Sequence, residues 1–420
     1  MSASSKRGLN LRQWKEQSIS KSSTAHSPVG MLWVPLRYRR GDRVVPAVQP
    51  DDLVVLGQAL TIPDDQSQPP VFSPFAGQVA GIERVDHPYL GEQTPCAVIR
   101  PNADAMPVSG QPLNTDSVQA QEIISRCKNA GIVDEIDGCF LHQKLMKAAQ
   151  EGCAIVVADA LDDQPYCTSG LRTLIERRSE VGRGTVLAAA ATGAARSCIA
   201  AYRPASVAPH LPLDADGVTV LELNGRYPCL SELTEQMKLW GGGIRIGIQA
   251  AAALARAVSN LSKQRAVMVT LGGPCLKTAV NFVVPLGTLT SELWERCVFR
   301  REPGMVVYGG VMTGRLGDFD HPVPLTHQMT SILLYPASPP EGQGRCVGCG
   351  RCSEVCPMGL VPALIARSYG RGNSRAVKRL GAHRCIGCGC CSFVCPMGCE
   401  VTRDVCAARD SCSAGASHSD

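Results

Sequence analysis

Two segments near the C-terminal end of the chain carry cysteines at the same spacing, C-x2-C-x2-C-x3-C-P. The first holds Cys346, Cys349, Cys352 and Cys356 before Pro357, and the second holds Cys385, Cys388, Cys391 and Cys395 before Pro396. Thiolates spaced in this way wrap the irons of a four-iron, four-sulfide cubane, with backbone amides turned toward its sulfides. The two segments therefore predict two [4Fe–4S] clusters and one-electron chemistry.

In two-cluster segments of this kind, the fourth cysteine of each run binds the other cluster. This rule assigns Cys346, Cys349, Cys352 and Cys395 to cluster 1, and Cys385, Cys388, Cys391 and Cys356 to cluster 2. Two zinc knuckles are an alternative, because C-x2-C pairs also bind zinc, but zinc sites seldom repeat a C-x3-C-P ending. Four cysteines outside the pattern are expected to be bystander thiols: Cys390, Cys399, Cys406 and Cys412.

The composition places the chain among globular, multi-domain proteins of a reducing compartment. Twelve of its 21 cysteines fall between Cys346 and Cys412, a local pattern that indicates metal binding rather than a disulfide framework, in the cytoplasm or facing it. A length of 420 residues suggests about two to four domains, and 45% hydrophobic with 19% charged residues is a globular balance. The net charge of +5 is too small to indicate nucleic-acid binding.

No apolar run is long enough to cross a membrane. The nearest, from Thr185 to Tyr202, contains Gly193, Arg196 and Ser197 and predicts an Ala-rich buried helix. Residues 1–27 are Ser-rich and basic, without the apolar stretch of a secretory signal. They predict a flexible basic tail, with a docking arm for anionic lipid or a partner as the alternative.

The patterns elsewhere divide the chain into four larger units. Short apolar runs between turn signals over 28–112 predict a β domain, and alternating helix and strand patterns over 113–262 predict an α/β layer. Over 263–335, strands at 265–270, 280–284 and 306–308 with a helix at 288–297 predict a small α+β module. A Pro- and Gly-rich linker, with Pro336, Pro339, Pro340, Gly342 and Gly344, opens the cysteine domain at 336–400. That domain is expected to contain helices at 362–368 and 374–380, followed by a flexible tail at 401–420.

Motifs beyond the cysteines resemble the C subunit of the Rnf, or Rsx, ion-translocating electron-transport complex. Gly41-Asp-Arg-Val, Leu56-Gly-Gln and Ser73-Pro-Phe-Ala-Gly-Gln-Val resemble its barrel-sandwich hybrid domain, although no Lys for carrier chemistry stands at the hairpin tip. Further motifs follow in the family's order: Arg226-Tyr-Pro-Cys229, Asn281-Phe-Val-Val-Pro-Leu-Gly287, Gly309-Gly-Val-Met-Thr-Gly314 and Met358-Gly-Leu-Val-Pro362. The resemblance covers residues 28 to 400 in broad terms.

The resemblance implies a multi-domain fold with both α/β and all-β parts. A barrel-sandwich hybrid is followed by a Rossmann-like domain similar to the flavin subunit of respiratory complex I. A β-grasp (SLBB-like) module and a C-terminal two-cluster, ferredoxin-like α-helical domain complete it. These four parts correspond to residues 28–112, 113–262, 263–335 and 336–400.

The resemblance also implies a flavin and NADH site, which this chain alters. Where the family has G-L-G-G-A-G-F-P-T-H-x-K-L, the chain reads from Val133 to Leu145 and keeps only Gly138, His142, Lys144 and Leu145. Asp134, Glu135 and Asp137 stand where a phosphate would lie, and like charges oppose its binding. The next motif, N-G-A-E-C-E-P-Y, appears as Asp159-Ala-Leu-Asp162-Asp163-Gln164-Pro165-Tyr166. We therefore expect neither FMN nor NADH, and we expect His142 and Lys144 to be helix-surface residues.

The leading functional hypothesis is an iron–sulfur electron-transfer subunit of an Rnf-like complex, peripheral on the cytoplasmic face of the inner (cell) membrane. It would relay single electrons between a ferredoxin-type carrier and membrane subunits, without a catalytic acid, base or nucleophile. Arg345, Arg351 and Arg384 beside the cysteines would raise cluster potentials or attract an acidic carrier, or are solvated loop residues.

Three other functions remain open from the sequence. The first is an FMN-containing NADH dehydrogenase subunit that feeds the clusters. The second is a non-catalytic docking or sensing protein braced by its clusters. The third resembles the cobalamin-reductase flavoprotein of bacterial microcompartments, whose barrel domain does not lead the chain.

Overall fold

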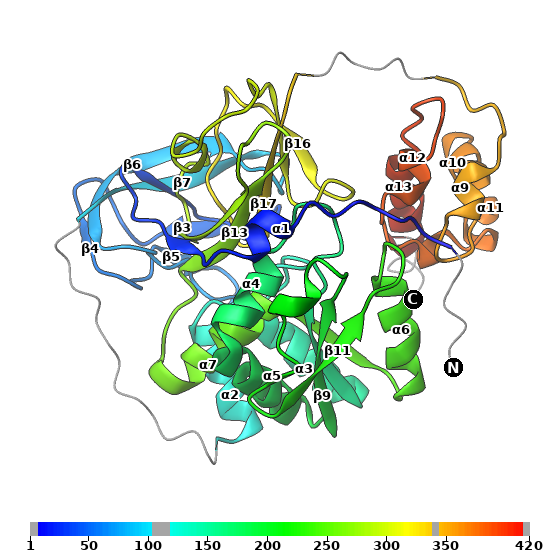
Figure 1. Ribbon diagram of the computed structural model, residues 1–420. Coiled ribbons are helices and arrows are strands. Elements are labelled where there is room, and N and C mark those ends of the chain that lie inside the picture. Colours follow the sequence, from blue (N-terminus) through cyan, green and yellow to red (C-terminus); the bar gives the residue numbers. More distant parts are fainter. Residues whose placement is uncertain (1–6, 103–117, 338–343, 415–420) are drawn as a thin grey trace.

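The computed structural model in Figure 1 describes residues 7–102, 118–337 and 344–414. Outside these ranges lie Lys6 of the expected basic tail, the expected boundary at residue 112, most of the linker (Pro339, Pro340 and Gly342), and residues 415–420. Sheets of four, five and six strands form the body of the molecule, and a helical lobe at one side carries the cysteine segments. The expected mixture of α/β and β architecture in several parts is confirmed.

The first part of the chain is a β structure around one apolar core. Its strands are β2 (Leu32–Pro35), β3 (Val44–Pro46), β4 (Leu53–Val54), β5 (Thr61–Pro63), β6 (Gly77–Asp86) and β7 (Gln93–Pro101). An antiparallel sheet has the order β2-β7-β6-β4, and β3 pairs with β5. Alternate side chains, such as Leu32 and Val34, point into the core, as the two-residue period of a strand requires.

The second part is an α/β layer with a mainly parallel sheet. Its strands are β8 (Ile155–Ala160), β9 (Arg196–Tyr202), β10 (Asp214–Ala215), β11 (Val218–Leu223) and β12 (Gly243–Gly247), in the order β10-β11-β9-β8-β12. Its helices are α2 (Ala120–Asn129), α3 (Leu141–Glu151), α4 (Ser169–Glu176), α5 (Arg178–Thr192), η1 (Ala208–His210), α6 (Leu230–Leu239) and α7 (Ile248–Asn260).

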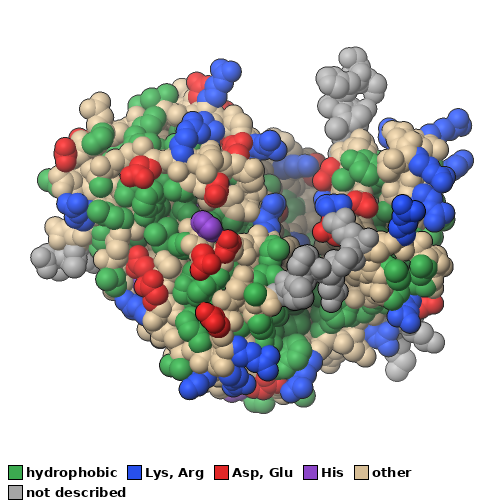
Figure 2. Space-filling view, turned by 90° about the horizontal axis from the view of Figure 1, so that it is seen from above, with side chains coloured by type: hydrophobic (Ala, Val, Ile, Leu, Met, Phe, Trp, Pro, Cys, Tyr) green, Lys and Arg blue, Asp and Glu red, His purple; other side chains and the backbone are tan. Residues whose placement is uncertain are grey.

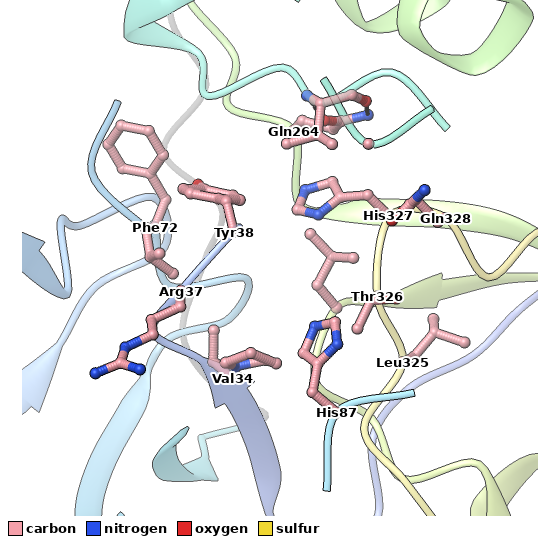
Figure 3. A pocket seen from close by; sticks show the side chains of 15 residues that line it. Val34, Arg37, Tyr38, Phe72, His87, Gln264, Leu325, Thr326, His327 and Gln328 are labelled. Carbon is pink, nitrogen blue, oxygen red and sulfur yellow. Dashed lines mark hydrogen bonds between the residues drawn. The ribbon is translucent and has the colours of Figure 1, made fainter. Parts of the chain in front are cut away.

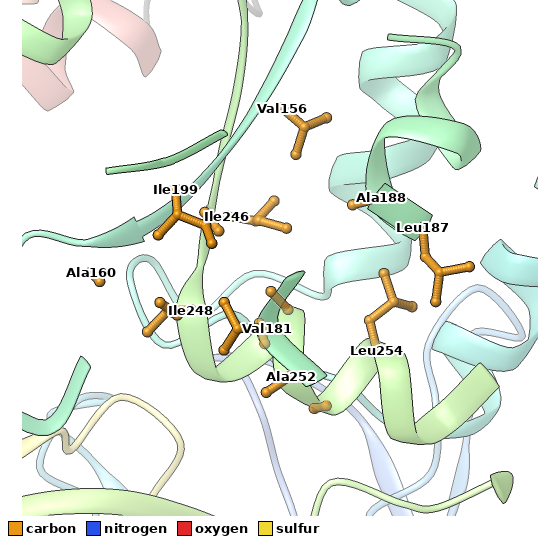
Figure 4. Close-up of a cluster of buried hydrophobic side chains, with 14 of the residues drawn as sticks. Val156, Ala160, Val181, Leu187, Ala188, Ile199, Ile246, Ile248, Ala252 and Leu254 are labelled. Carbon is orange, nitrogen blue, oxygen red and sulfur yellow. The ribbon is translucent and has the colours of Figure 1, made fainter. Parts of the chain in front are cut away.

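Alternate residues of the parallel strands face opposite layers of helices. Val156, Ile199 and Ile246 pack with α5 and α7 in the larger core, where Leu254 and Ala188 join them (Figure 4). The intervening residues, such as Val157, face α6. Because both faces are covered, the strands read as continuous apolar runs in the sequence.

The expectation of one helix from Thr185 to Tyr202 is wrong. Helix α5 ends at Thr192, and the following Gly193 has a φ of 71° while its N–H bonds back to the carbonyl of Ala190. A left-handed glycine at this position ends a helix. The chain then turns into β9, a central strand of the sheet.

The third part is a six-stranded sheet in which a strand from the N-terminal segment forms one edge. Its strands are β1 (Thr24–Ala25), β13 (Ala266–Gly272), β14 (Val280–Pro285), β15 (Met305–Tyr308), β16 (Arg315–Gly317) and β17 (Ser331–Tyr335), in the order β1-β14-β13-β17-β15-β16. The helix expected at 288–297 is only α8 (Ser291–Trp294). Hydrogen bonds of Thr288 and Thr290 to neighbouring loops hold the preceding residues outside the helix.

The expected flexible tail at 1–27 differs from the structure over residues 7–27. This segment includes α1 (Glu16–Ile19) and β1, and Gly8 N–H donates to the Val355 carbonyl of the helical lobe at 3.1 Å. Lys15 is fully buried and donates to Gln13 Oε1 at 2.5 Å and to the Gln164 carbonyl. The segment expected to be a solvated basic tail therefore contributes a buried amino group to the interior, and burial lowers the pKa of Lys15.

The helical lobe contains α9 (Arg351–Glu354), α10 (Pro362–Gly370), α11 (Ser374–Arg379), η2 (Ala382–Arg384), α12 (Cys390–Phe393) and α13 (Val401–Ala414). The helices expected at 362–368 and 374–380 are present, but the tail expected at 401–420 is helix α13 over most of its length. Val401, Val405 and Ala408 recur at helical spacing and pack with Ile365 in the core of the lobe.

Candidate functional site

Two cavities in the helical lobe are each lined by four of the motif cysteines. Cys346, Cys349, Cys352 and Cys395 line a cavity of about 230 Å³, which we call the outer cavity because Cys346 and Cys349 are exposed. The second, or inner, cavity contains buried thiols and is lined by Cys356, Cys385, Cys388 and Cys391. Each fourth cysteine thus lies with the first three of the other segment, the grouping that the crossing rule requires. The ligand role of each thiol stays a prediction.

The two cysteine segments repeat one local fold. Helices α9 and α12 begin directly after Gly350 and Gly389, which have φ angles of 78° and 82°. Backbone N–H groups point at sulfur in both segments: Leu360 N donates to Cys356 Sγ, and Gly387 N donates to Cys385 Sγ, each at 3.4 Å. Such amide donors stabilise a thiolate and tune the potential of a cluster that it binds.

Three of the four expected bystander cysteines lie against motif thiols. Cys390, only 1% exposed, also lines the inner cavity, and its contact with Cys388 together with burial raises its pKa. The Cys406 thiol is hydrogen-bonded to Cys385, and this hydrogen bond lowers the pKa of Cys385 to about 6. The Cys399 thiol is hydrogen-bonded to Cys395. The sequence places Cys390 directly beside Cys391, but its spacing gave no sign of the contacts that Cys399 and Cys406 make with motif thiols.

Among the residues in the described ranges, no group of three or more His, Cys, Asp or Glu side chains is arranged to hold a single metal ion. The motif thiols surround cavities instead. A four-iron cluster needs such a space, because its sulfides and irons lie between the thiolates. The donor set at each cavity therefore fits an iron–sulfur cluster, with about 230 Å³ of space between the thiols at the outer cavity and about 20 Å³ at the inner cavity.

The acidic loop before α3 binds the N-terminus of α7 with its own carboxylates. Glu135 accepts hydrogen bonds from the backbone N–H groups of Gln249 at 2.6 Å and Ala250 at 3.0 Å. Asp134 accepts from Gly247 N–H at 3.0 Å. A helix N-terminus is a natural anion-binding site, and here the chain occupies it. The approach requires glycine at 247, because a Cβ there would lie 2.2 Å from the Glu135 carboxyl group.

Lys144 neutralises part of this loop. Its Nζ lies 2.5 Å from Asp134 Oδ2 and 2.8 Å from Asp137 Oδ2. Burial alone would lower the pKa of Lys144, but the two carboxylates outweigh burial and raise it. Burial, followed by the charge of Asp134, raises the pKa of Glu135 to about 8. The expectation that Lys144 is a simple surface residue is therefore wrong.

His142 is also not a surface residue. It is buried, and its Nε2 lies 2.9 Å from the Ser67 carbonyl oxygen in the β part of the chain. Burial lowers the pKa of His142, so the imidazole is neutral near pH 7. The side chain joins two parts of the fold.

The second altered motif is covered by the N-terminal segment. Trp14 stacks on Tyr166 with ring centroids 5.2 Å apart, and Tyr166 N–H donates to the Gln13 carbonyl at 2.8 Å. Beneath them, burial raises the pKa values of Asp162 and Asp163 to about 6, with Lys15 nearby acting against the shift. This motif and the acidic loop are thus both filled by groups of the chain, so the residues present do not fit a flavin phosphate.

A third cavity carries no catalytic arrangement. It holds about 50 Å³ between the β part and residues 325–328, room for a few water molecules. Figure 3 shows His87 and His327 facing it. Burial lowers the pKa of His87 to about 4 and that of His327 to about 3, so both imidazoles are neutral at physiological pH.

The three arginines singled out beside the cysteines occupy different places. Arg351 lines the outer cavity, together with Arg367, which sequence spacing did not indicate. Arg384 lies at the end of η2 and contacts Gly381, and Arg345 precedes the first cysteine at the edge of the lobe. Of the three arginines, Arg351 lines the outer cavity, and Arg345 and Arg384 do not.

Comparison with known proteins identifies two parts of the chain. Residues 3–104 match the family described as the RnfC barrel sandwich hybrid domain, and residues 345–399 match the 4Fe-4S dicluster domain family. These matches support the expected barrel-sandwich part and iron–sulfur clusters in the cysteine segments.

Similar curated proteins cover most of the chain. The C subunit of the proton-translocating ferredoxin:NAD(+) oxidoreductase complex of Clostridium ljungdahlii is 23% identical over 83% of this chain and 81% of its own length. The C subunit of the ion-translocating oxidoreductase complex of Rhodobacter capsulatus is 26% identical over 84% of this chain and 72% of its own. The C subunit of the Na(+)-translocating ferredoxin:NAD(+) oxidoreductase complex of Acetobacterium woodii is 26% identical over 82% and 84%.

Among solved structures, an NAD+-reducing [NiFe]-hydrogenase in the H2-reduced state aligns with a TM-score of 0.43 and 12% identity. The alignment covers 64% of this chain and 52% of the hydrogenase chain. Within the described part of the present chain, no helix combines the length and apolar character needed to cross a bilayer.

Proposed function

We propose that this RnfC-like protein is an iron–sulfur electron-transfer subunit of an Rnf-type oxidoreductase complex. The observation that carries the proposal is the grouping of the motif thiols around two neighbouring cavities, four thiols to each. We assign Cys346, Cys349, Cys352 and Cys395 to one [4Fe–4S] cluster. Cys385, Cys388, Cys391 and Cys356 are assigned to the other.

A bound cluster supplies reversible one-electron transfer at its irons. The chain provides the rest. Cysteine thiolates hold the irons, amide N–H groups such as that of Gly387 stabilise the negative sulfur, and side chains such as Leu360 and Val405 keep water from the inner cavity. Binding and positioning are sufficient for this function, so no side chain acts as acid, base or nucleophile.

No hydride step is assigned to this chain. In the acidic loop, Asp134 and Glu135 accept hydrogen bonds from the backbone N–H groups that an anionic ligand would need. We therefore propose a relay that contains neither FMN nor NADH. The NAD+ in the names of the relatives belongs to their complexes as a whole.

The partners follow from the relatives. Their names describe ferredoxin-linked, ion-translocating complexes. We propose a ferredoxin-type carrier on one side and the other subunits of an Rnf-type complex on the other. A peripheral position on the cytoplasmic face of the cell membrane is consistent with both partners.

Quantifying iron, sulfide and flavin together in protein purified without oxygen tests the function. We expect on the order of eight irons and eight sulfides per chain, from two four-iron sites, and no flavin. Dithionite should bleach the visible absorption, and added acceptor should restore it. Stoichiometric FMN would instead favour an NADH dehydrogenase subunit. Clusters that take electrons from dithionite but pass none to an acceptor would favour a docking or sensing protein.

A further inference from the structure

We propose that the face of the lobe around the outer cavity is the docking site of an acidic electron-carrier protein, which exchanges single electrons with this chain there. The inference rests on the proposed function and adds the face that is used and the charge of the partner. Three independent features of the lobe support it: the unequal covering of the two cavities, an exposed apolar rim, and a surplus of basic side chains.

Within the described ranges, parts of the chain outside the lobe contact the segment that lines the inner cavity, whereas lobe residues alone line the outer cavity. Tyr227 Oη donates to the Cys388 carbonyl at 2.7 Å. The backbone at Gly389 packs so closely on the Met312 carbonyl that a Cβ would lie 2.3 Å from its oxygen. At the outer cavity, Cys346 and Cys349 are exposed. Electron transfer weakens steeply with distance, so an external carrier reaches the outer site first.

Apolar side chains surround the outer opening. Val347 is 65% exposed, Leu364 45% and Met397 36%, and all three line the cavity. Exposed apolar groups gathered at one place usually form the centre of an interface, with polar groups at its rim. A patch of this small size suits a carrier that binds briefly and leaves.

The lobe has a strong positive charge that it does not neutralise. Residues 344–414 contain ten Lys and Arg against four Asp and Glu, a surplus of six, while the whole chain has a surplus of five. Among the described residues, ion pairs in the lobe involve only Arg403 and Arg409. The basic side chains without such a pair are Arg345, Arg351, Arg367, Arg371, Arg375, Lys378, Arg379 and Arg384.

These charges favour an acidic partner at this place. Arg351 and Arg367 line the outer cavity itself, and the basic residues of α11 continue the surface beyond Arg367. In Figure 2, Lys and Arg side chains gather on the right-hand lobe, which carries the cysteine segments. A field of one sign steers an oppositely charged protein and orients it as it arrives.

The exchange balances simply. A cluster held by Cys346, Cys349, Cys352 and Cys395 would let one electron pass from the reduced carrier to this chain. The carrier loses one electron and this chain gains one electron, with no covalent bond made or broken. The reverse transfer uses the same contact.

Binding of an acidic two-cluster ferredoxin to the iron-loaded chain tests the proposal, measured by calorimetry at low and high salt. The test variant is Arg351→Glu/Arg367→Glu. Arg43→Glu/Arg183→Glu is the matched control, because both of its arginines are exposed, form no ion pair within the described ranges, and lie in the β and α/β parts. A basic cytochrome c serves as the probe of opposite charge.

We expect the test variant to weaken ferredoxin binding at low salt about tenfold or more, and the control variant to change it less than about twofold. High salt should reduce the difference. Iron content is measured on each variant. If Arg351→Glu lowers the iron content, Arg367→Glu alone is the second variant. Arg367 lines the outer cavity from α10 rather than from either cysteine segment, and its replacement is expected to weaken binding at full iron content.

Equal binding by the test and control variants would overturn the docking proposal while leaving the relay intact. So would cytochrome c binding as tightly as ferredoxin. Binding of the lobe to vesicles of anionic phospholipid through the same arginines, without binding ferredoxin, would also overturn it. The proposed function fails by a different measurement, namely the absence of iron from the unaltered chain.

Discussion

Replacing motif cysteines in pairs reveals which thiols share a cluster. Cys356 belongs by sequence to the first segment but lines the inner cavity with Cys388, whereas Cys349 lines the outer cavity. If the cavities define the clusters, Cys356→Ala/Cys388→Ala removes two ligands from one cluster. Cys356→Ala/Cys349→Ala removes one ligand from each.

The expected iron content follows from these assignments. The unaltered chain should hold about eight irons, and Cys356→Ala should hold about four because one four-iron cluster loses a ligand. Cys356→Ala/Cys388→Ala should also hold about four, since the second change affects a cluster already lost. Cys356→Ala/Cys349→Ala should approach zero. The non-additivity of the first pair is the sign of a shared site.

Iron and sulfide are measured on protein prepared without oxygen, and far-ultraviolet circular dichroism confirms that each variant is folded. Cys412→Ala, which alters a cysteine outside the motif pattern, is the control and should keep about eight irons. The reverse result, with Cys356→Ala/Cys349→Ala at half content and Cys356→Ala/Cys388→Ala near zero, would show that each segment binds its own cluster. The crossed assignment would then be wrong.

Three further changes test the regions around the clusters. The pKa of Glu135 in the folded chain, about 8, lies above its ordinary value of 4.5. Glu135 therefore contributes stability that is present below pH 4.5 and is lost as the pH rises through 8. The urea midpoint of unfolding should fall over this range more for the unaltered chain than for Glu135→Gln. Gly247→Ala should destabilise the α/β part by about 1–3 kcal/mol, seen in the same assay, because the new Cβ meets the Glu135 carboxyl group; an unchanged midpoint would contradict this contact. Tyr227→Phe removes the hydrogen bond to the Cys388 carbonyl and should cost about 1 kcal/mol, with faster loss of inner-site iron to a chelator; equal chelation rates would refute the role of this contact.

The acidic loop shows how the α/β layer satisfies the N-terminus of α7 from within the chain. The N–H groups of Gln249 and Ala250 at the start of α7 need acceptors, and Glu135 supplies both. Gly247 gives the room for this approach. The Glu135 carboxyl group thus supplies acceptors to a helix end from within the chain.

The sequence was sufficient for the features that depend on local spacing. The repeated cysteine pattern predicted iron–sulfur chemistry, because cluster binding needs several thiolates within a few residues of one another. Helices such as α10 and strands such as β8 followed from residue periodicity. The motif order indicated the resemblance to the Rnf family, which the matches at residues 3–104 and 345–399 support.

Contacts between distant residues required the tertiary structure. Lys15 looked like part of a solvated tail, but it is buried near Asp162 and Asp163, which lie far along the sequence. Cys390 and Cys406 looked like bystanders, although they touch motif thiols. The difference between the outer and inner cavities depends on which surfaces Tyr227 and Met312 cover. Burial and charge pairing are properties of the folded chain, so residue spacing fixes the chemistry here while packing decides which thiols face solvent.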